Sequence, residues 1–398
     1  MNARALRPAA ATAPQENFLP YGRQTIDDQD ILAVAAILRS DYLTTGPAAE
    51  AFERAVADFV GADHAIACSN GTAALHLAMM ALGVGPGDAV IVPTITFLST
   101  ANAARFCGAD VIFADVDPDT ALMTPATLRE AIARAGARKI KAIVPVHLGG
   151  SACAMEEIAV IAQKIGAAIV EDACHALATS SEAGRVGNCR HSNMTVFSFH
   201  PVKTIATGEG GMVTTRDPDM AQKLRRLRNH GVVREADEFV DASLSSDTDG
   251  LAAPWAYEMQ SLGYNYRLSD IQAALGLSQM RKLPAFANRR RALSLLYADA
   301  LPAHIDHVRM NPGACPHLFI ALMDFSAASR GELIRRLRQA GIGAQVHYMP
   351  VHRQPYYKAL YGETHLPGAE KYYSRCLSLP LFPGMTDDDA LRVVEALG

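Results

Sequence analysis

The chain has 398 residues, of which 49% are apolar and 20% are charged, and its formal net charge is -4. This length and apolar content can bury a large core in more than one domain. The slightly acidic balance, without a basic stripe, argues against a nucleic-acid binder, and no apolar stretch is long enough to span a bilayer.

The N-terminal segment 1–18 is predicted to be a flexible tail, because its start has no apolar core of the kind that signal peptides carry. The 7 cysteines stand singly, without a Cys-x-x-Cys pair. This spacing argues against a disulfide framework and a structural zinc site, and it favours a reducing compartment. We therefore expect a cytoplasmic protein that holds no metal ion.

Short apolar runs then alternate with helical patterns. Because apolar residues occupy consecutive positions in the runs, we interpret them as strands buried on both faces. The runs are 65–68, 89–93, 111–114, 142–147, 167–171, 195–200 and 211–215, and the helical segments include 71–82, 124–135 and 155–165. The pattern predicts an α/β fold with a mostly parallel central sheet covered by helices on both faces, and ligands at the carboxyl ends of its strands.

The second part of the chain changes character. Residues 232–253 are acidic and serine-rich and are predicted to form an exposed loop. A helical pattern follows over 268–282, and Pro284 is expected to end or kink that helix. We predict a large domain over 19–269 and a smaller C-terminal α/β domain over 270–398.

The first candidate site lies between a predicted strand and a predicted helix, where residues 68–72 read Cys-Ser-Asn-Gly-Thr. Ser69 or Asn70 can cap the helix, Gly71 lets a ligand approach the backbone, and the helix N-terminus favours an anion. A simple turn and cap explains the same pattern. The sequence has neither a Walker motif nor a Gly-x-Gly-x-x-Gly turn into a helix, which counts against P-loop and dinucleotide sites.

The second candidate is the carboxylate of Asp172, which follows the predicted strand 167–171. At that position it can cap a turn, bind a metal or pair with a protonated heterocycle. The metal is less favoured, because no His-Glu-x-x-His or comparable ligand pair is present. The nearby His175, taken alone, is typical of a partly buried histidine with satisfied hydrogen bonds.

The third candidate is Lys203, which stands just after the predicted strand 195–200 and before a glycine-rich turn. A lysine in a partly desolvated cleft has a lowered pKa and can form a Schiff base, although most loop lysines are simply solvated. Together the three candidates match the needs of pyridoxal phosphate: an anion site for the phosphate, an acid for the ring nitrogen and a lysine for the aldehyde.

Four longer motifs make the chain resemble the DegT/DnrJ/EryC1/StrS family of sugar aminotransferases, from about residue 19 to the C-terminus. They are Tyr-Leu-Thr-Thr-Gly-Pro at 42–47, Val-Phe-Ser-Phe-His-Pro-Val-Lys at 196–203, Gly-Tyr-Asn-Tyr-Arg at 263–267 with Asp-Ile-Gln-Ala-Ala-Leu-Gly at 270–276, and Gln-Val-His-Tyr-Met-Pro-Val-His at 345–352. The resemblance implies the type I pyridoxal-phosphate aminotransferase fold and a homodimer with its active site at the subunit interface.

The resemblance also implies roles for single residues. Lys203 would bind pyridoxal 5'-phosphate and move the proton, Asp172 would pair with the ring nitrogen, and His175 would lie beside the ring. The other cofactor-binding residues would be Phe97 on the ring face, Gly71, Thr72 and Ser198 at the phosphate, and Asn265 reaching over from the partner subunit. The sugar-nucleotide pocket would be lined by Tyr21, Asp41, Tyr42, Leu43, Thr44, Gln345, Val346, His347 and Tyr348.

The implied reaction transfers an amino group from L-glutamate to C4 of a UDP-linked 4-keto-6-deoxy-N-acetyl sugar. Its product would be UDP-4-amino-4,6-dideoxy-N-acetyl-β-L-altrosamine, for pseudaminic acid biosynthesis. Related deoxysugar dehydratases carry a histidine where this chain has Lys203, so the lysine favours transamination. The alternatives are another nucleotide-linked 3- or 4-keto sugar as acceptor, a non-catalytic sensor of cofactor or sugar nucleotide and, more distantly, a metal-dependent hydrolase.

Overall fold

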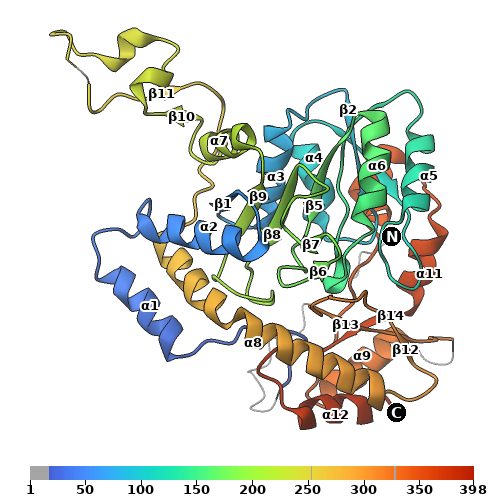
Figure 1. Cartoon of the computed structure of the whole chain (residues 1–398). Coiled ribbons are helices and arrows are strands. Elements are labelled where there is room, and N and C mark those ends of the chain that lie inside the picture. Colours follow the sequence, from blue (N-terminus) through green and yellow to red (C-terminus); the bar gives the residue numbers. More distant parts are fainter. Residues whose placement is uncertain (1–17, 252, 327–328) are drawn as a thin grey trace, which may run out of the picture.

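The computed structural model describes residues 18–251, 253–326 and 329–398, so most of the predicted tail lies outside the described residues. Its centre is a seven-stranded sheet (Figure 1). In chain order the strands are β1 (His64–Cys68), β2 (Asp88–Pro93), β3 (Asp110–Ala114), β4 (Lys139–Ile143), β5 (Ala168–Asp172), β8 (Met194–Ser198) and β9 (Gly211–Thr215). The spatial order is β1-β9-β8-β5-β4-β2-β3, and β9 runs antiparallel to both of its neighbours.

The prediction of a mostly parallel sheet is therefore confirmed. Two predicted runs extend past their strands. The run 195–200 passes the end of β8 at Ser198, and the run 142–147 passes the end of β4 at Ile143, after which the short 3-10 helix η1 (Leu148–Gly150) follows. The carboxyl ends of β1, β2, β4, β5 and β8 all lie at one edge of the sheet. This edge is where a ligand site is expected in such a fold.

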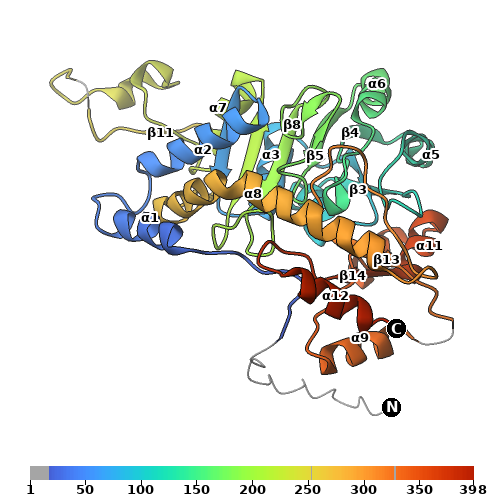
Figure 2. The ribbon, with the colours of Figure 1, turned by 60° about the horizontal axis from the view of Figure 1, so that its bottom comes forward.

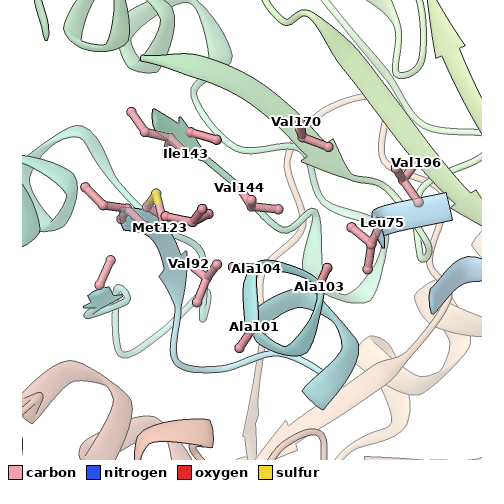
Figure 3. Close-up of a cluster of buried hydrophobic side chains, with 14 of the residues drawn as sticks. Leu75, Val92, Ala101, Ala103, Ala104, Met123, Ile143, Val144, Val170 and Val196 are labelled. Carbon is pink, nitrogen blue, oxygen red and sulfur yellow. The ribbon is translucent and has the colours of Figure 1, made fainter. Parts of the chain in front are cut away.

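Helices cover both faces of the sheet (Figure 2). They include α2 (Pro47–Val60), α3 (Gly71–Ala81), α4 (Leu98–Phe106), α5 (Pro125–Ala135), α6 (Met155–Ile165) and α7 (Pro218–Leu227). Strand β1 shows how the faces divide: Ile66 and Cys68 join the apolar cluster around α3, whereas Ala65 and Ala67 join the cluster around α2. Figure 3 shows the α3 side of this core, with Leu75 and Val196 among its buried side chains.

The C-terminal part builds its own antiparallel sheet from β12 (Asp306–His307), β13 (Phe319–Leu322) and β14 (Cys376–Leu379). The other elements here are α9 (Arg330–Gln339), η4 (Val351–Arg353), α10 (Pro355–Tyr361), α11 (Pro367–Arg375) and α12 (Asp387–Glu395). A third apolar cluster joins the strands to α9 and α12. The division into domains at residue 270 stays a prediction.

The long helix α8 (Asp270–Ala300) connects the two parts, as Figure 2 shows. Ser269 begins it with a capping box. Of the two alternatives for Pro284, that it ends or that it kinks the helix, the first is wrong, because the helix continues for sixteen residues beyond it. Pro284 lies on the exposed side, while Leu283 packs into the apolar cluster around α2 and Leu293 packs into the third apolar cluster. Packing on both sides of the proline holds the helix together despite the missing N–H.

The predicted loop 232–253 extends from the body in Figure 1 and is mostly exposed, as expected. It contains β10 (Val232–Val233), η2 (Ala236–Glu238) and η3 (Ala242–Ser245), and β10 pairs with β11 (Glu258–Met259). The remaining elements are α1 (Asp28–Leu38), which packs on α8, and the hairpin of β6 (Ser180–Ser181) and β7 (Gly184–Arg185). Within the described ranges, no helix combines the length and apolar character that crossing a membrane requires.

Candidate active site

A cavity of about 1010 Å³ opens at the carboxyl edge of the large sheet. All three sequence candidates line it: the start of α3 after β1, the end of β5, and the turn after β8 that carries Lys203. The N-terminal turn of α4 and residues 345–349 of the C-terminal part complete the wall. The topology therefore brings together side chains that lie far apart in the sequence.

The start of α3 forms one end of the cavity. Asn70 is the N-cap residue of the helix, and its side chain accepts a hydrogen bond from the N–H of Ala73 at 2.8 Å. Gly71 and Thr72 are the first two residues of the helix and line the cavity. A Cβ at Gly71 would lie only 2.9 Å from the Cβ of Ser198, so a side chain there would push the two segments apart. Backbone N–H groups at a helix N-terminus, next to the Ser198 hydroxyl, suit a phosphate group.

Asp172 ends β5 and is 5% exposed. One carboxylate oxygen accepts a hydrogen bond from the hydroxyl of Thr100 at 2.7 Å, and the other accepts one from the N–H of Cys174 at 3.2 Å. A carboxylate has about four acceptor sites, so two partners leave acceptor capacity facing the cavity. This arrangement suits a protonated ring nitrogen.

Lys203 lies in the turn after β8 and lines the same cavity. Burial lowers the pKa of its ammonium group, against the opposing effects of Cys174 and the negative charge of Asp172. A lowered pKa increases the fraction of neutral amine, which is the nucleophilic form. The amine is thus suited to react with an aldehyde and to accept a proton.

His175 stands behind this pair with a defined tautomer. Its Nδ1 accepts a hydrogen bond from the N–H of Gly149 at 3.3 Å, so Nε2 carries the proton and donates to the hydroxyl oxygen of Tyr348 at 3.2 Å. Burial, together with the nearby charge of Lys203, holds the pKa of His175 well below its usual value. Burial also raises the pKa of Tyr348, so its hydroxyl keeps a proton that it can donate.

The predicted substrate residues divide into two groups. Tyr21 and residues 345–348 line the cavity, with the rings of Tyr21 and His347 5.4 Å apart. Burial, helped by the charge of Lys203, lowers the pKa of His347 to about 3. By contrast, residues 41–44 and Asn265 are exposed and are not part of this chain's cavity wall.

The sequence interpretation missed several residues of the site. Thr100 donates to Asp172, and the ring of His317 packs against His175 with centroids 4.4 Å apart. The hydroxyl spacing Thr-x-x-Ser-Thr over residues 96–100 is a local signal that could have pointed to Thr100. His317 had no such signal, since it comes from the far end of the chain.

The cavity residues fit pyridoxal phosphate on observations of the structure itself. The cofactor has three parts that need different partners. The start of α3 at Gly71 suits the phosphate, the Asp172 carboxylate suits the ring nitrogen, and the Lys203 amine with its lowered pKa suits the aldehyde. Within the described part of the chain, no group of three or more His, Cys, Asp or Glu side chains could hold a metal ion.

Comparison with known proteins agrees with this arrangement. Residues 24–398 match the model of the DegT/DnrJ/EryC1/StrS aminotransferase family. The chain is 40% identical over 392 residues to the spore coat polysaccharide biosynthesis protein SpsC of Bacillus subtilis (strain 168), covering 96% of this chain and 97% of that protein.

Solved structures show the same likeness. Helicobacter pylori PseC, an aminotransferase involved in the biosynthesis of pseudoaminic acid, matches with a TM-score of 0.85 and 28% identity over 96% of this chain and 98% of PseC. Spr1654 from Streptococcus pneumoniae in its PLP form matches with a TM-score of 0.85 and 27% identity over 96% and 97%. A PMP form of Spr1654 matches as well.

Proposed function

Because the chain belongs to the DegT/DnrJ/EryC1/StrS aminotransferase family, we propose that it transfers an amino group from L-glutamate to C4 of a UDP-linked 4-keto-6-deoxy-N-acetyl sugar. It is a pyridoxal-phosphate-dependent sugar aminotransferase with the type I fold. The proposal adds the acceptor, the donor and the residues. The single observation that supports the residue roles best is that Lys203 and Asp172 line one cavity together with the start of α3.

When bound, pyridoxal phosphate supplies a protonated ring that withdraws electrons from the reacting carbon. The chain supplies the proton transfers: Lys203 would act as base and then as acid in each half-reaction, removing the α-proton of the donor in the first half and delivering a proton to C4 of the sugar in the second. Asp172 would keep the ring nitrogen protonated, because its carboxylate has acceptor capacity on the cavity side. Tyr348, whose hydroxyl oxygen accepts a hydrogen bond from Nε2 of His175, would donate its own hydroxyl hydrogen bond to the substrate.

Phe97 would cover one face of the ring. It is 57% exposed and lines the cavity at the start of α4, so its ring is available for a planar partner. Gly71, Thr72 and Ser198 would bind the phosphate. The exposure of residues 41–44 and Asn265 in a single chain supports a homodimer in which these residues complete the site of the other subunit.

The decisive experiment has two parts. Borohydride reduction and peptide mass spectrometry should find the cofactor on Lys203, and ¹⁵N-glutamate with the UDP-4-keto-6-deoxy-N-acetyl sugar should give a labelled 4-amino product. Lys203→Ala should lower the rate by roughly 10³-fold, in line with loss of a general acid–base. An unaltered rate in this variant would refute the role of Lys203.

A second acceptor deserves the same assay. Because identity to SpsC, a spore coat polysaccharide biosynthesis protein, is 40% and identity to PseC is 28%, a keto sugar other than the pseudaminic acid precursor is the second candidate. A panel of nucleotide-linked 3- and 4-keto sugars, each with glutamate, distinguishes the two. Turnover that is higher with another acceptor would replace the first proposal without affecting the roles of Lys203 and Asp172.

Two further parts of the proposal concern the protein's setting. A homodimer should be seen by light scattering at the concentration used for activity assays. A cytoplasmic location is supported by the seven free cysteines, which suit a reducing compartment. Fractionation of cells that produce the protein, with detection by antibody, tests the location.

A further inference from the structure

Residues 96–100, which lead into the first turn of α4, present three hydroxyl side chains to the cavity wall. They belong to Thr96, Ser99 and Thr100, all of which are buried, while Phe97 between them is exposed to the cavity. A hydroxyl that is buried this far needs a hydrogen-bond partner within the protein. The partners of these three hydroxyls connect the turn to two separate parts of the site.

The hydrogen bonds at Asp172 have a defined direction. The carboxylate only accepts, so the single hydroxyl proton of Thr100 is committed to its Oδ2 atom at 2.7 Å. The hydroxyl oxygens of Thr96 and Thr100 are 2.7 Å apart. Because the proton of Thr100 is already used, Thr96 must donate to Thr100. A directed chain therefore runs from Thr96 through Thr100 to Asp172.

Water cannot replace this chain, because Thr100 is 1% exposed and Thr96 is 2% exposed. The same turn also reaches α3: the hydroxyl oxygens of Ser99 and Thr72 are 2.8 Å apart. One helical turn is thus bonded both to the carboxylate and to the start of α3, at opposite ends of the expected cofactor position.

We propose that Thr100 is a positioning residue that, supported by Thr96, fixes the orientation of the Asp172 carboxylate, while Ser99 fixes Thr72 from the same turn. The inference rests on the proposed role of Asp172 at the ring nitrogen. It assigns to α4 the task of setting the distance between the ring-nitrogen partner and the phosphate site. Neither Thr100 nor Ser99 is required to touch the cofactor for this purpose.

The test compares Thr100→Val, which keeps the shape and loses the hydroxyl, with Thr100→Ser, which keeps the hydroxyl. The apoproteins are titrated with pyridoxal phosphate and followed by visible absorbance. Thr100→Val should raise the dissociation constant about tenfold, since a hydrogen bond to a charged group is lost, and Thr100→Ser should stay within about twofold of the parent. The absorbance maximum should shift in the valine variant and return in the serine variant.

Two results would overturn the inference: a valine variant that binds and absorbs like the parent, or equal losses in the valine and serine variants, which would indicate packing alone. If Thr100→Val does not fold, Thr96→Val removes only the supporting donor and should raise the dissociation constant about threefold. An unchanged dissociation constant in that folded variant would also count against the directed chain of hydrogen bonds from Thr96 to Asp172. Borohydride trapping on Lys203 in the parent protein is independent: its failure would refute the proposed function, whereas its success with an unaffected valine variant would refute only this inference.

Discussion

Two neighbouring carboxylates at the end of β5 are equally buried but differ in the face they point to and in their hydrogen-bond partners. Glu171 and Asp172 are each 5% exposed, but successive strand residues point to opposite faces. Asp172 faces the cavity. Glu171 accepts hydrogen bonds from Nε2 of His147 at 2.7 Å, from Ser192 at 2.5 Å and from Thr195 at 3.0 Å. One strand end therefore has a cavity face and a closed face.

The difference teaches how to recognise a carboxylate that is available to a ligand. Glu171 accepts from three side-chain donors and does not line the cavity at the carboxyl edge of the sheet, whereas Asp172 accepts from two donors and lines it. His147 is neutral in this arrangement, because its Nδ1 accepts from the N–H of Cys153 at 3.1 Å and its proton lies on Nε2, toward Glu171. The closed face is thus a satisfied polar network, and we expect it to serve stability alone.

The sharpest test of this comparison is Asp172→Asn. A neutral amide cannot hold a protonated ring nitrogen, so kcat should fall about 10³-fold, as when a preorganised electrostatic partner is removed. The thermal midpoint should change little. Steady-state amino transfer and calorimetry measure the two quantities, and a kcat within twofold of the parent would show that the cavity face has been misidentified.

The matched change on the closed face is Glu171→Gln. It should lower the free energy of unfolding by about 3 kcal/mol, because buried donors lose a charged acceptor. The visible spectrum of the folded protein should stay the same. Denaturant titration beside the Asp172→Asn protein provides the comparison. If Glu171→Gln proved as stable as the parent but inactive, the roles of the two faces would be reversed.

Acid should lower the free energy of unfolding through His347, which lines the cavity. Its pKa is about 3 in the folded protein because burial and the charge of Lys203 disfavour the cation, against an ordinary 6.5. The unfolded state therefore binds more protons between these values, so this contribution to stability is full above pH 6.5 and is lost as pH falls toward 3. Between pH 6.5 and 5, the free energy of unfolding should therefore fall by about 2 kcal/mol less in His347→Asn than in the parent.

Unfolding titrations at these two pH values measure that difference, with His304→Asn as the control. His304 is exposed, so its replacement controls for the loss of one imidazole outside the cavity. Parallel curves for the parent and His347→Asn would mean that His347 is not kept neutral by the cavity wall.

The smallest expected effect concerns the pH dependence of cofactor uptake. Only the neutral amine of Lys203 reacts with an aldehyde, and burial lowers its pKa despite the effects of Cys174 and Asp172. The uptake rate of the apoprotein should therefore rise with pH and level off below 10.5, the ordinary lysine value. Stopped-flow absorbance follows this rate. A midpoint at or above 10.5 would indicate a solvated lysine.

Much of the fold was predictable because its signals are local. Seven apolar runs matched the seven strands of the large sheet, since strands buried on both faces are apolar throughout. Pro284 misled the interpretation because a proline weakens a helix locally, while packing on both sides of it is a property of the tertiary structure. The sequence could not distinguish the faces of β5 either, because the partners of Glu171 come from other segments.

In the site, too, local signals were predictable and tertiary contacts were not. Gly71, Asp172 and Lys203 stand at predictable strand ends, and these ends meet at one edge. Thr100 and His317 were missed because their importance comes from contacts with residues 72 and 142 positions away in the chain. Whether Asn265 joins the site depends on a second subunit and stays a prediction.

The helix α8 limits how this chain can be divided. Its first half, with Leu283 and Phe286, packs on the face of the large sheet that α2 covers, and its second half, with Leu293 and Tyr297, belongs to the other core. A truncation just before Asp270 would strip apolar cover from the fragment that remains, and the released piece would carry a bare apolar stripe into water. Excised fragments of either kind should aggregate, so genetic dissection of this enzyme is better done by point substitution than by deletion.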